Sequence, residues 1–164
     1  MKLELENINE LSANDKIDIF EQGMIENLEL VDCPLKHTFT DGMYVREIFM
    51  KARLIITSKI HKTTHPFNIS KGKVLVWTDE EKSVILEAPY SGVTKPNTRR
   101  VLYIIEDCIW TTYHCRSEEE ITPEQIEARI IEPHINPLIG NKYWEEIEML
   151  RNNLIEKGGI SRVL

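Results

Sequence analysis

The chain of 164 residues has a mass of 19.2 kDa and carries 20 Lys and Arg against 27 Asp and Glu, which gives a formal net charge of −7. This length favours one domain, and a hydrophobic content of 41% supplies one sizeable core, so a disordered or collagen-like chain is excluded. No apolar run approaches the ~18 residues of a membrane span, and the acidic start is unlike a signal peptide. We therefore expect no membrane partner and a cytoplasmic location.

The charge is unevenly distributed along the chain. Residues 1–32 hold 2 basic and 9 acidic side chains, residues 33–114 hold 12 and 8, and residues 115–164 hold 6 and 10. A mildly basic middle between acidic ends can meet an anionic ligand, but the favoured explanation is that acidic helices pack beside a basic barrel in the same or a neighbouring subunit. Nucleic-acid binding is not expected, because the strongest basic cluster is only Arg99 and Arg100.

The first predicted element is an amphipathic helix over residues 12–30. Its apolar residues recur at three- and four-residue spacings, and Ser12, Asn14 or Asp15 can cap its start. Pro34 follows its end.

Short β-branched and aromatic runs follow, separated by turn residues that include Lys71-Gly72 and Glu106-Asp107. About eight short runs at even spacing, with no helix-length segment among them, predict an antiparallel sandwich or small barrel. The runs are residues 43–50, 54–61, 66–70, 73–78, 83–88, 92–95, 99–105 and 109–114.

Helical patterns return after residue 115. Ser117 with Glu120, and Thr122 with Gln125, both match the capping box, and a last helix is predicted over residues 142–157.

The resulting organisation has three parts. An N-terminal helical extension (1–41) precedes a β-barrel (42–115), and a C-terminal helical extension (116–164) follows it, all within one structural domain. Such extensions often clasp a second subunit, so we expect a homo-oligomer, with a dimer favoured.

Three of the histidines suggest a constellation. His61 ends one predicted strand, His65 opens the next segment, and His114 ends the last strand. If these side chains point into the barrel mouth, they can bind a divalent metal, and imidazoles suit zinc, iron, nickel and copper alike. Ordinary buried histidines are the alternative interpretation. The three cysteines lack the close paired spacing of a zinc knuckle or a disulfide framework.

The stretch from Gly42 to His114 resembles a single-domain cupin. The family's first motif reads Gly, five residues, His-x-His, three or four residues, Glu, six residues, Gly. Counting back from Gly72 places His65 at the glutamate of the motif, His61 at the second histidine and Lys59 at the first. Two nitrogen ligands are thus retained, and a lysine occupies one ligand position.

The family's second motif is looser in this chain. Residues 95–100 fit it if Asn97 adopts the left-handed turn of the family's glycine, and Arg100 then takes the place of the histidine. Arg99 should point to the opposite face, because side chains alternate along a strand. The stretch from Gly42 to His114 is similar in particular to small cupin-like proteins encoded by tailed bacteriophages.

The resemblance implies a mainly β fold, an antiparallel double-stranded β-barrel of the cupin or jelly-roll type with N- and C-terminal α-helical extensions. It also implies a divalent metal at His61, His65 and His114, and a small anionic ligand at Lys59 and Arg100, although an exposed Lys59 with no ligand role is an alternative. No catalytic residue is assigned, and enzyme activity is left open.

The sequence is compatible with two other functions. One is a catalytically silent cupin scaffold that forms an oligomer with phage structural or accessory roles; the other is a counter-defence protein that sequesters a nucleotide. The resemblance places the protein in the cytoplasm of an infected host cell or in the virion.

Overall fold

The computed structural model describes residues 11–29, 31–78 and 82–132. The chain forms two compact units, one of Met1–Val31 with Ile135–Ser161 and one of Asp32–His134 with Arg162–Leu164. The helix predicted over residues 142–157 lies outside the described residues. None of the helices in the described ranges has the length and apolar character that a membrane crossing requires.

Helix α1 (Ala13–Asn27) belongs to the first unit and confirms the predicted N-terminal helix. Ser12 is its N-cap: the Ser12 hydroxyl accepts a hydrogen bond from the Asp15 N–H at 3.2 Å, and the Asp15 carboxylate accepts one from the Ser12 N–H at 3.2 Å. This reciprocal capping box satisfies two backbone donors that a helix start otherwise leaves unpaired.

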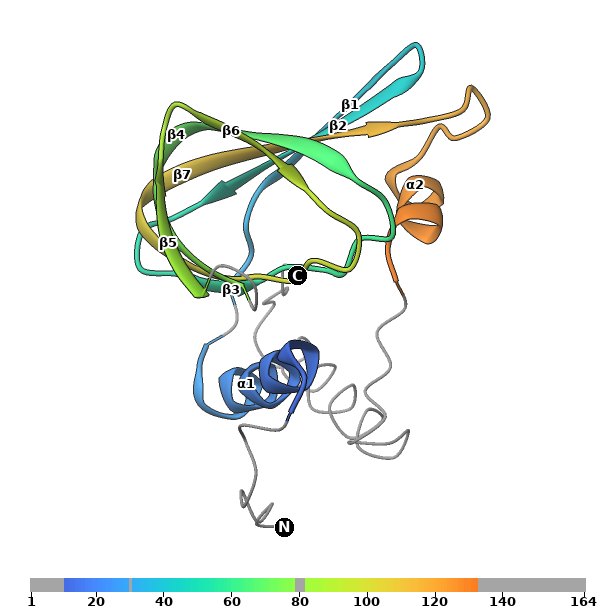
Figure 1. The fold of residues 1–164 in the computed structure, drawn as a ribbon. Coiled ribbons are helices and arrows are strands. Elements are labelled where there is room, and N and C mark those ends of the chain that lie inside the picture. Colours follow the sequence, from blue (N-terminus) through green and yellow to red (C-terminus); the bar gives the residue numbers. More distant parts are fainter. Residues whose placement is uncertain (1–10, 30, 79–81, 133–164) are drawn as a thin grey trace. The chain divides into compact units, whose positions relative to one another are not determined.

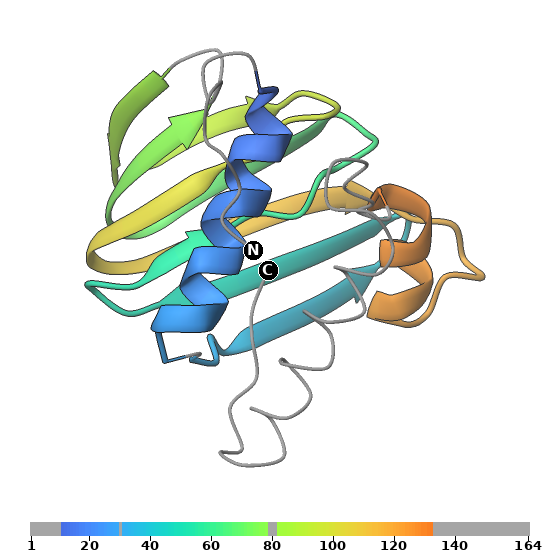
Figure 2. The same cartoon turned by 90° about the horizontal axis from the view of Figure 1, so that it is seen from below.

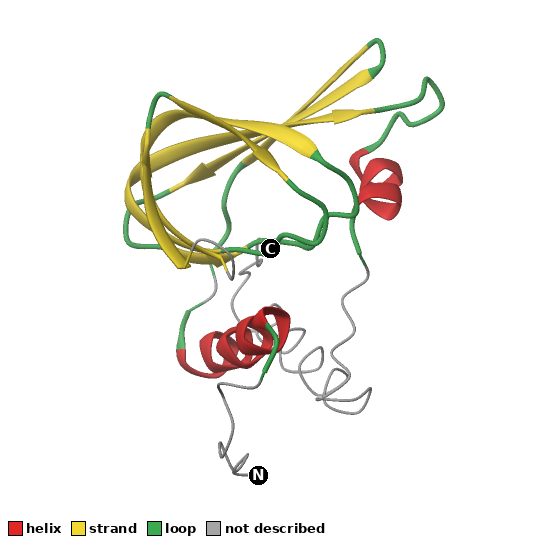
Figure 3. Ribbon diagram, in the orientation of Figure 1, coloured by secondary structure: helices red, strands yellow, loops and turns green. Residues whose placement is uncertain are grey.

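The second unit is a seven-stranded antiparallel barrel, and strands dominate its described part (Figure 3). The two longest strands, β4 and β7, pair with each other at the centre of the sheet order and curve along the barrel (Figure 1). β2 lies beside β7 on the side away from β4, and β1 lies beyond β2, which gives the order β1, β2, β7, β4 (Figure 2). The strands are β1 (Leu35–Thr40), β2 (Met43–Met50), β3 (Ile55–Thr57), β4 (His65–Thr78), β5 (Lys82–Glu87), β6 (Tyr90–Thr94) and β7 (Val101–Cys115).

Each half of the two long strands has different neighbours. The first half of β4 pairs with β6 and its second half with β5, whereas the first half of β7 pairs with β3 and its second half with β2. Two sheets that share bent strands enclose one core, which is how a jelly-roll barrel closes. The predicted mainly β fold, an antiparallel barrel of the jelly-roll type with helices before and after it, is confirmed.

The predicted breaks at Lys71-Gly72 and Glu106-Asp107 are wrong, because both segments lie inside continuous strands. The register between β4 and β7 shifts between Ile69 and Val74, so these residues form bulges where the strands bend. Gly72 has φ +90, and its Cα lies against the Asp107 backbone. Turn-type residues here bend a strand without ending it.

Strand β1 and the length of β3 also differ from the predictions. β1 was not predicted, because four of its six residues are exposed at the edge of the sheet and leave little apolar alternation. The predicted strand over residues 54–61 is shortened to Ile55–Thr57, since the chain beyond it pairs with residues 130–132 instead.

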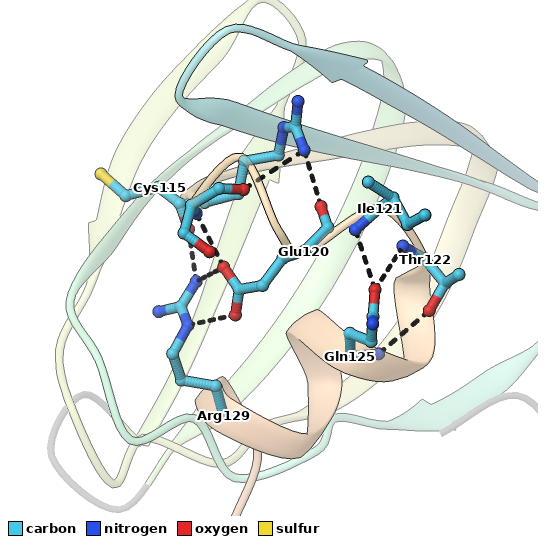
Figure 4. Close-up of polar contacts among 8 residues, drawn as sticks. Cys115, Glu120, Ile121, Thr122, Gln125 and Arg129 are labelled. Atoms are coloured by element: carbon cyan, nitrogen blue, oxygen red, sulfur yellow. Dashed lines mark hydrogen bonds and ion pairs between the residues drawn. The ribbon is translucent and has the colours of Figure 1, made fainter.

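Helix α2 (Pro123–Ile130) confirms the second predicted capping box. The Thr122 hydroxyl accepts from the Gln125 N–H at 3.3 Å, and the Gln125 side chain accepts from the Thr122 N–H at 3.1 Å (Figure 4). The first box, at Ser117 and Glu120, forms a turn and not a helix. The Glu120 carboxylate accepts from the Ser117 N–H at 2.9 Å, and it also accepts from the Arg129 Nε at 2.6 Å, which ties the turn to α2.

The barrel interior holds one apolar cluster, in which Phe67 and Trp110 stack with their ring centroids 4.5 Å apart. A second cluster joins α2 to the barrel through Tyr44, Ile126 and Ile130. These contacts fix the position of α2 on the end of the barrel that carries the histidines.

Candidate metal centre and cationic cavity

Three buried histidines meet at one end of the barrel. The register pairs Tyr44 of β2 with His114 of β7, and it pairs Phe67 of β4 with Thr112 of β7. Continuing the antiparallel register by two residues brings His65 opposite His114 on the same face. His61 joins them from the segment between β3 and β4. The barrel topology thus brings together the three histidines that the sequence analysis singled out.

The geometry of the cluster is compact. The ring centroids of His65 lie 4.4 Å from those of His61 and His114, and the His61 and His114 rings stack at 5.6 Å. One ring nitrogen from each histidine can be chosen so that all three lie within 4.8 Å of one another. Nitrogens on a tetrahedral ion at bond lengths near 2.1 Å are about 3.4 Å apart, so movements of about 1 Å would close the site around a metal.

Each outer histidine of the cluster has a buried nitrogen that lacks a partner. Among the described residues, nothing hydrogen-bonds to the Nδ1 of His61 or of His114, and both atoms are buried. The remaining contacts hold the rings: the His114 Nε2 lies 3.1 Å from the Thr112 hydroxyl, and the His65 Nδ1 lies 3.3 Å from the Thr63 carbonyl oxygen. Metal-ligating histidines are oriented by such second contacts, so the donor set fits a divalent metal.

The environment keeps all three imidazoles neutral. Burial, then the neighbouring histidines and Arg46, lowers the pKa of His61 to about 3. Burial, then His65, Arg46 and Arg129, lowers the pKa of His114 to about 3 as well. Burial also lowers the pKa of His65. Neutral imidazole is the form that binds metal, so the cluster is in its ligating state at pH 7.

The last residue of α2 and the two residues after it hold the backbone on which His61 lies. His61 forms a β-bridge with Ile131, the Lys62 N–H donates to the Ile130 carbonyl at 2.7 Å, and the Glu132 N–H donates to the Ile60 carbonyl at 2.9 Å. The His61 carbonyl accepts a further bond from the Asn97 N–H at 2.8 Å. Asn97 has φ +63, so the predicted left-handed turn at this residue is confirmed.

A cavity of about 80 Å³ opens beside the histidines. The described residues that line it include three basic side chains and no carboxylate. Its lining comprises Arg46, Ile48, Met50, Ile56, Thr57, Ser58, Lys59, His61, His65, Thr94, Arg100, Leu102, Trp110 and Thr112.

Lys59 and Arg100, the two predicted anion-binding residues, both line this cavity, but their surroundings differ. The Lys59 Nζ lies 2.8 Å from the Glu127 carboxylate, with both side chains about one-third exposed, so an acidic partner on α2 offsets its charge. The Arg100 guanidinium lies over the rings of Phe67 and Trp110, 5.4 and 5.9 Å from their centroids. Arg99 is buried and is not among the described residues that line the cavity.

Sequence reasoning missed Arg46 of β2. Arg46 pairs with Thr112 in the register, two residues along β7 from His114, and lines the cavity. Its buried Nε has no hydrogen-bond partner among the described residues. The available signal was its parity: in the run from Tyr44 to Met50, Arg46 shares a face with Tyr44, Ile48 and Met50, which a core-facing pattern would otherwise fill with apolar residues.

No protein-family model matches the sequence, and no curated protein matches it. Among solved structures, an RmlC-like cupin from Shewanella frigidimarina is 14% identical with a TM-score of 0.45, and the alignment covers 59% of this chain and 91% of that one. A cupin-2 domain-containing protein from the same organism is 12% identical with a TM-score of 0.42, over 65% and 94%. A protein from Neisseria meningitidis is 7% identical with a TM-score of 0.44, over 58% and 95%.

Proposed function

We propose that this chain is a cupin-type protein that binds a divalent metal through His61, His65 and His114 and receives a small anionic ligand in the adjoining cavity. The observation that carries the proposal is the buried cluster of neutral imidazoles, two of which have a buried Nδ1 that no residue in the described part of the chain hydrogen-bonds. Burying a polar atom without a hydrogen bond is costly, and a metal ion would satisfy these atoms.

Three nitrogen ligands leave coordination positions for water or a ligand. Such an ion supplies Lewis acidity when bound, and imidazoles alone do not choose between zinc, iron, nickel and copper. Around it, Arg46 and Arg100 place positive charge on the cavity wall, and no described lining residue is acidic. This chemistry supports an anionic ligand and leaves turnover open.

The test is elemental analysis of protein purified without a chelator or a histidine tag. We expect near-stoichiometric divalent metal in the wild type, and its loss in His61→Ala and His114→Ala. His37→Ala is the matched control, because His37 is an exposed histidine that contacts the Tyr44 hydroxyl and lies outside the cluster. Circular dichroism checks that each variant is folded.

Folded wild-type protein that stays far below one equivalent of metal after reconstitution would contradict the proposal. Equal metal content in His37→Ala and the cluster variants would contradict the ligand assignment.

The homo-oligomer, the phage origin with its structural partners, and the location in an infected cell or virion stay predictions. Light scattering of the purified chain tests the first of these, since a monomer at micromolar concentration contradicts it.

A further inference from the structure

The cavity changes character along strand β2. Arg46, Ile48 and Met50 are successive residues of the strand face that lines the cavity, and they lead away from the row that holds His114. Strand β7 shows the same order, with His114, then Thr112, then Trp110. Along these two strands the cavity wall therefore changes from cationic and polar to apolar, and the one basic side chain on the Trp110 side among the described lining residues, Arg100, lies over the Phe67 and Trp110 rings.

The polar end contains two buried polar atoms that no described residue satisfies. The Arg46 Nε and the Thr94 hydroxyl are both buried, and neither has a hydrogen-bond partner among the described residues. Thr94 pairs with His65 in the register between β6 and β4, so this hydroxyl lies beside the histidine row. A buried guanidinium nitrogen without a hydrogen-bond partner costs free energy, and an anion placed between these groups would offset that cost.

The other cations of the cavity are already engaged. Lys59 pairs with Glu127, and Arg100 is stacked over aromatic rings at the Phe67 and Trp110 side. Arg46 therefore supplies the guanidinium that can bind two oxygens of one anionic group next to the histidines.

The apolar end restricts what can be attached to that group. Ile48, Met50 and Leu102 present only hydrocarbon and thioether surface, and Arg100 on the Trp110 side is already stacked on two aromatic rings, so burying a second charge on this surface would cost free energy. A compact apolar body gains from burial on the same surface.

We propose that the cavity binds a small monocarboxylic acid with an apolar body, its carboxylate held by Arg46 and Thr94 and its body packed on Ile48 and Met50. This assignment rests on the proposed function, because it names the class of ligand for the same cavity. Arg46 is its specificity-determining residue.

The test measures thermal stabilisation and calorimetric binding of full-length protein with 3-methylbutanoate, 3-methylbutanamide, acetate and inorganic phosphate. We expect 3-methylbutanoate to bind, because it has both the charge and the body. The neutral amide, acetate and phosphate should each bind roughly tenfold more weakly or worse, since each lacks one of the two features. Equal binding of acid and amide, or tighter binding of phosphate, would overturn the proposal.

Variants locate the site. Arg46→Met should abolish the response to 3-methylbutanoate, and Thr94→Val should weaken it. Lys36→Met, which removes an exposed lysine of the same hairpin, should keep it. A full response in Arg46→Met would overturn the assignment. If Arg46→Met does not fold, Thr94→Val and the comparison of acid with amide on the wild type still test whether the cavity binds the carboxylate.

Elemental analysis of the same preparations separates the two proposals. Metal-loaded wild-type protein that shows no preference for 3-methylbutanoate overturns the ligand class and leaves the metal site standing. A preference for 3-methylbutanoate in protein that binds no metal supports the ligand class and contradicts the metal site.

Discussion

Replacing Gly72 with alanine tests the bend that closes the barrel. Gly72 has φ +90, and a Cβ built there would lie 2.7 Å from the Asp107 carbonyl carbon and 2.8 Å from the Cys108 Cα, with the Asp107 oxygen nearer still. These are backbone atoms of the paired strand β7, so no side-chain rotation relieves the contact.

The magnitude follows from two contributions. A non-glycine residue at such a φ costs roughly 1–2 kcal/mol. Forcing two paired backbones apart is an overpacking change that costs about 1–3 kcal/mol more. We therefore expect the free energy of unfolding to fall by about 3 kcal/mol. At about 4 °C per kcal/mol for a unit of this size, the melting temperature should fall by roughly 12 °C.

Gly42→Ala is the matched control. Gly42 has φ +71 in the turn between β1 and β2, but a Cβ there would meet nothing within 4 Å. This substitution should cost about 1 kcal/mol, from the backbone conformation alone. Urea unfolding of both variants, followed by circular dichroism, measures the difference. Equal losses in Gly72→Ala and Gly42→Ala would refute the reasoning that the approach of β7 makes Gly72 necessary.

Three further predictions concern the histidine end of the barrel. With metal removed, the protein should lose stability as pH falls from 6.5 towards 3: the pKa values of His61 and His114 are near 3 when folded and near 6.5 when unfolded, so the unfolded state binds more protons in that window. Urea titrations at several pH values should show a slope of up to about 1.4 kcal/mol per pH unit for each histidine, and a flat profile would contradict this. Ile130→Ala should lower the free energy of unfolding by about 3 kcal/mol, because this side chain is 2% exposed. The same substitution should lower the metal content, because it loosens the segment that holds His61. Ile121→Ala, at an exposed side chain, should change neither the stability nor the metal content. Thr122→Ala should cost about 1 kcal/mol of stability by removing the cap of α2, whereas Thr122→Ser should not, and equal melting temperatures for the two variants would argue against the capping role.

The helix starts, most strand-forming runs and one backbone conformation were predictable from the sequence, since they depend on residues close together in the chain. The boxes at Ser12 and Thr122 each join residues three apart. The left-handed turn at Asn97 reflects a side chain that tolerates positive φ. The histidine cluster was predicted from strand ends together with the cupin resemblance, which supplied the alignment of Lys59, His61 and His65.

The long strands and the partners of the cationic residues depended on tertiary contacts. From the sequence, Gly72 is predicted to lie in a turn. In the structure it lies in a bulge within β4, where the backbone of β7 approaches it closely. Lys59 was predicted to bind an anionic ligand, but its ammonium group pairs with the carboxylate of Glu127, which lies 68 residues further along the chain.

What the sequence alone determined is therefore the class of fold, the starts of the helices α1 and α2 and the three histidines as the site to inspect. Those features follow from local periodicity, capping chemistry and side-chain type. Tertiary structure decided that Arg46 lines the cavity with a buried Nε that no described residue hydrogen-bonds, and that the segment ending α2 holds His61 in place. Both results depend on strand register and on contacts between distant segments, which only a packed barrel establishes.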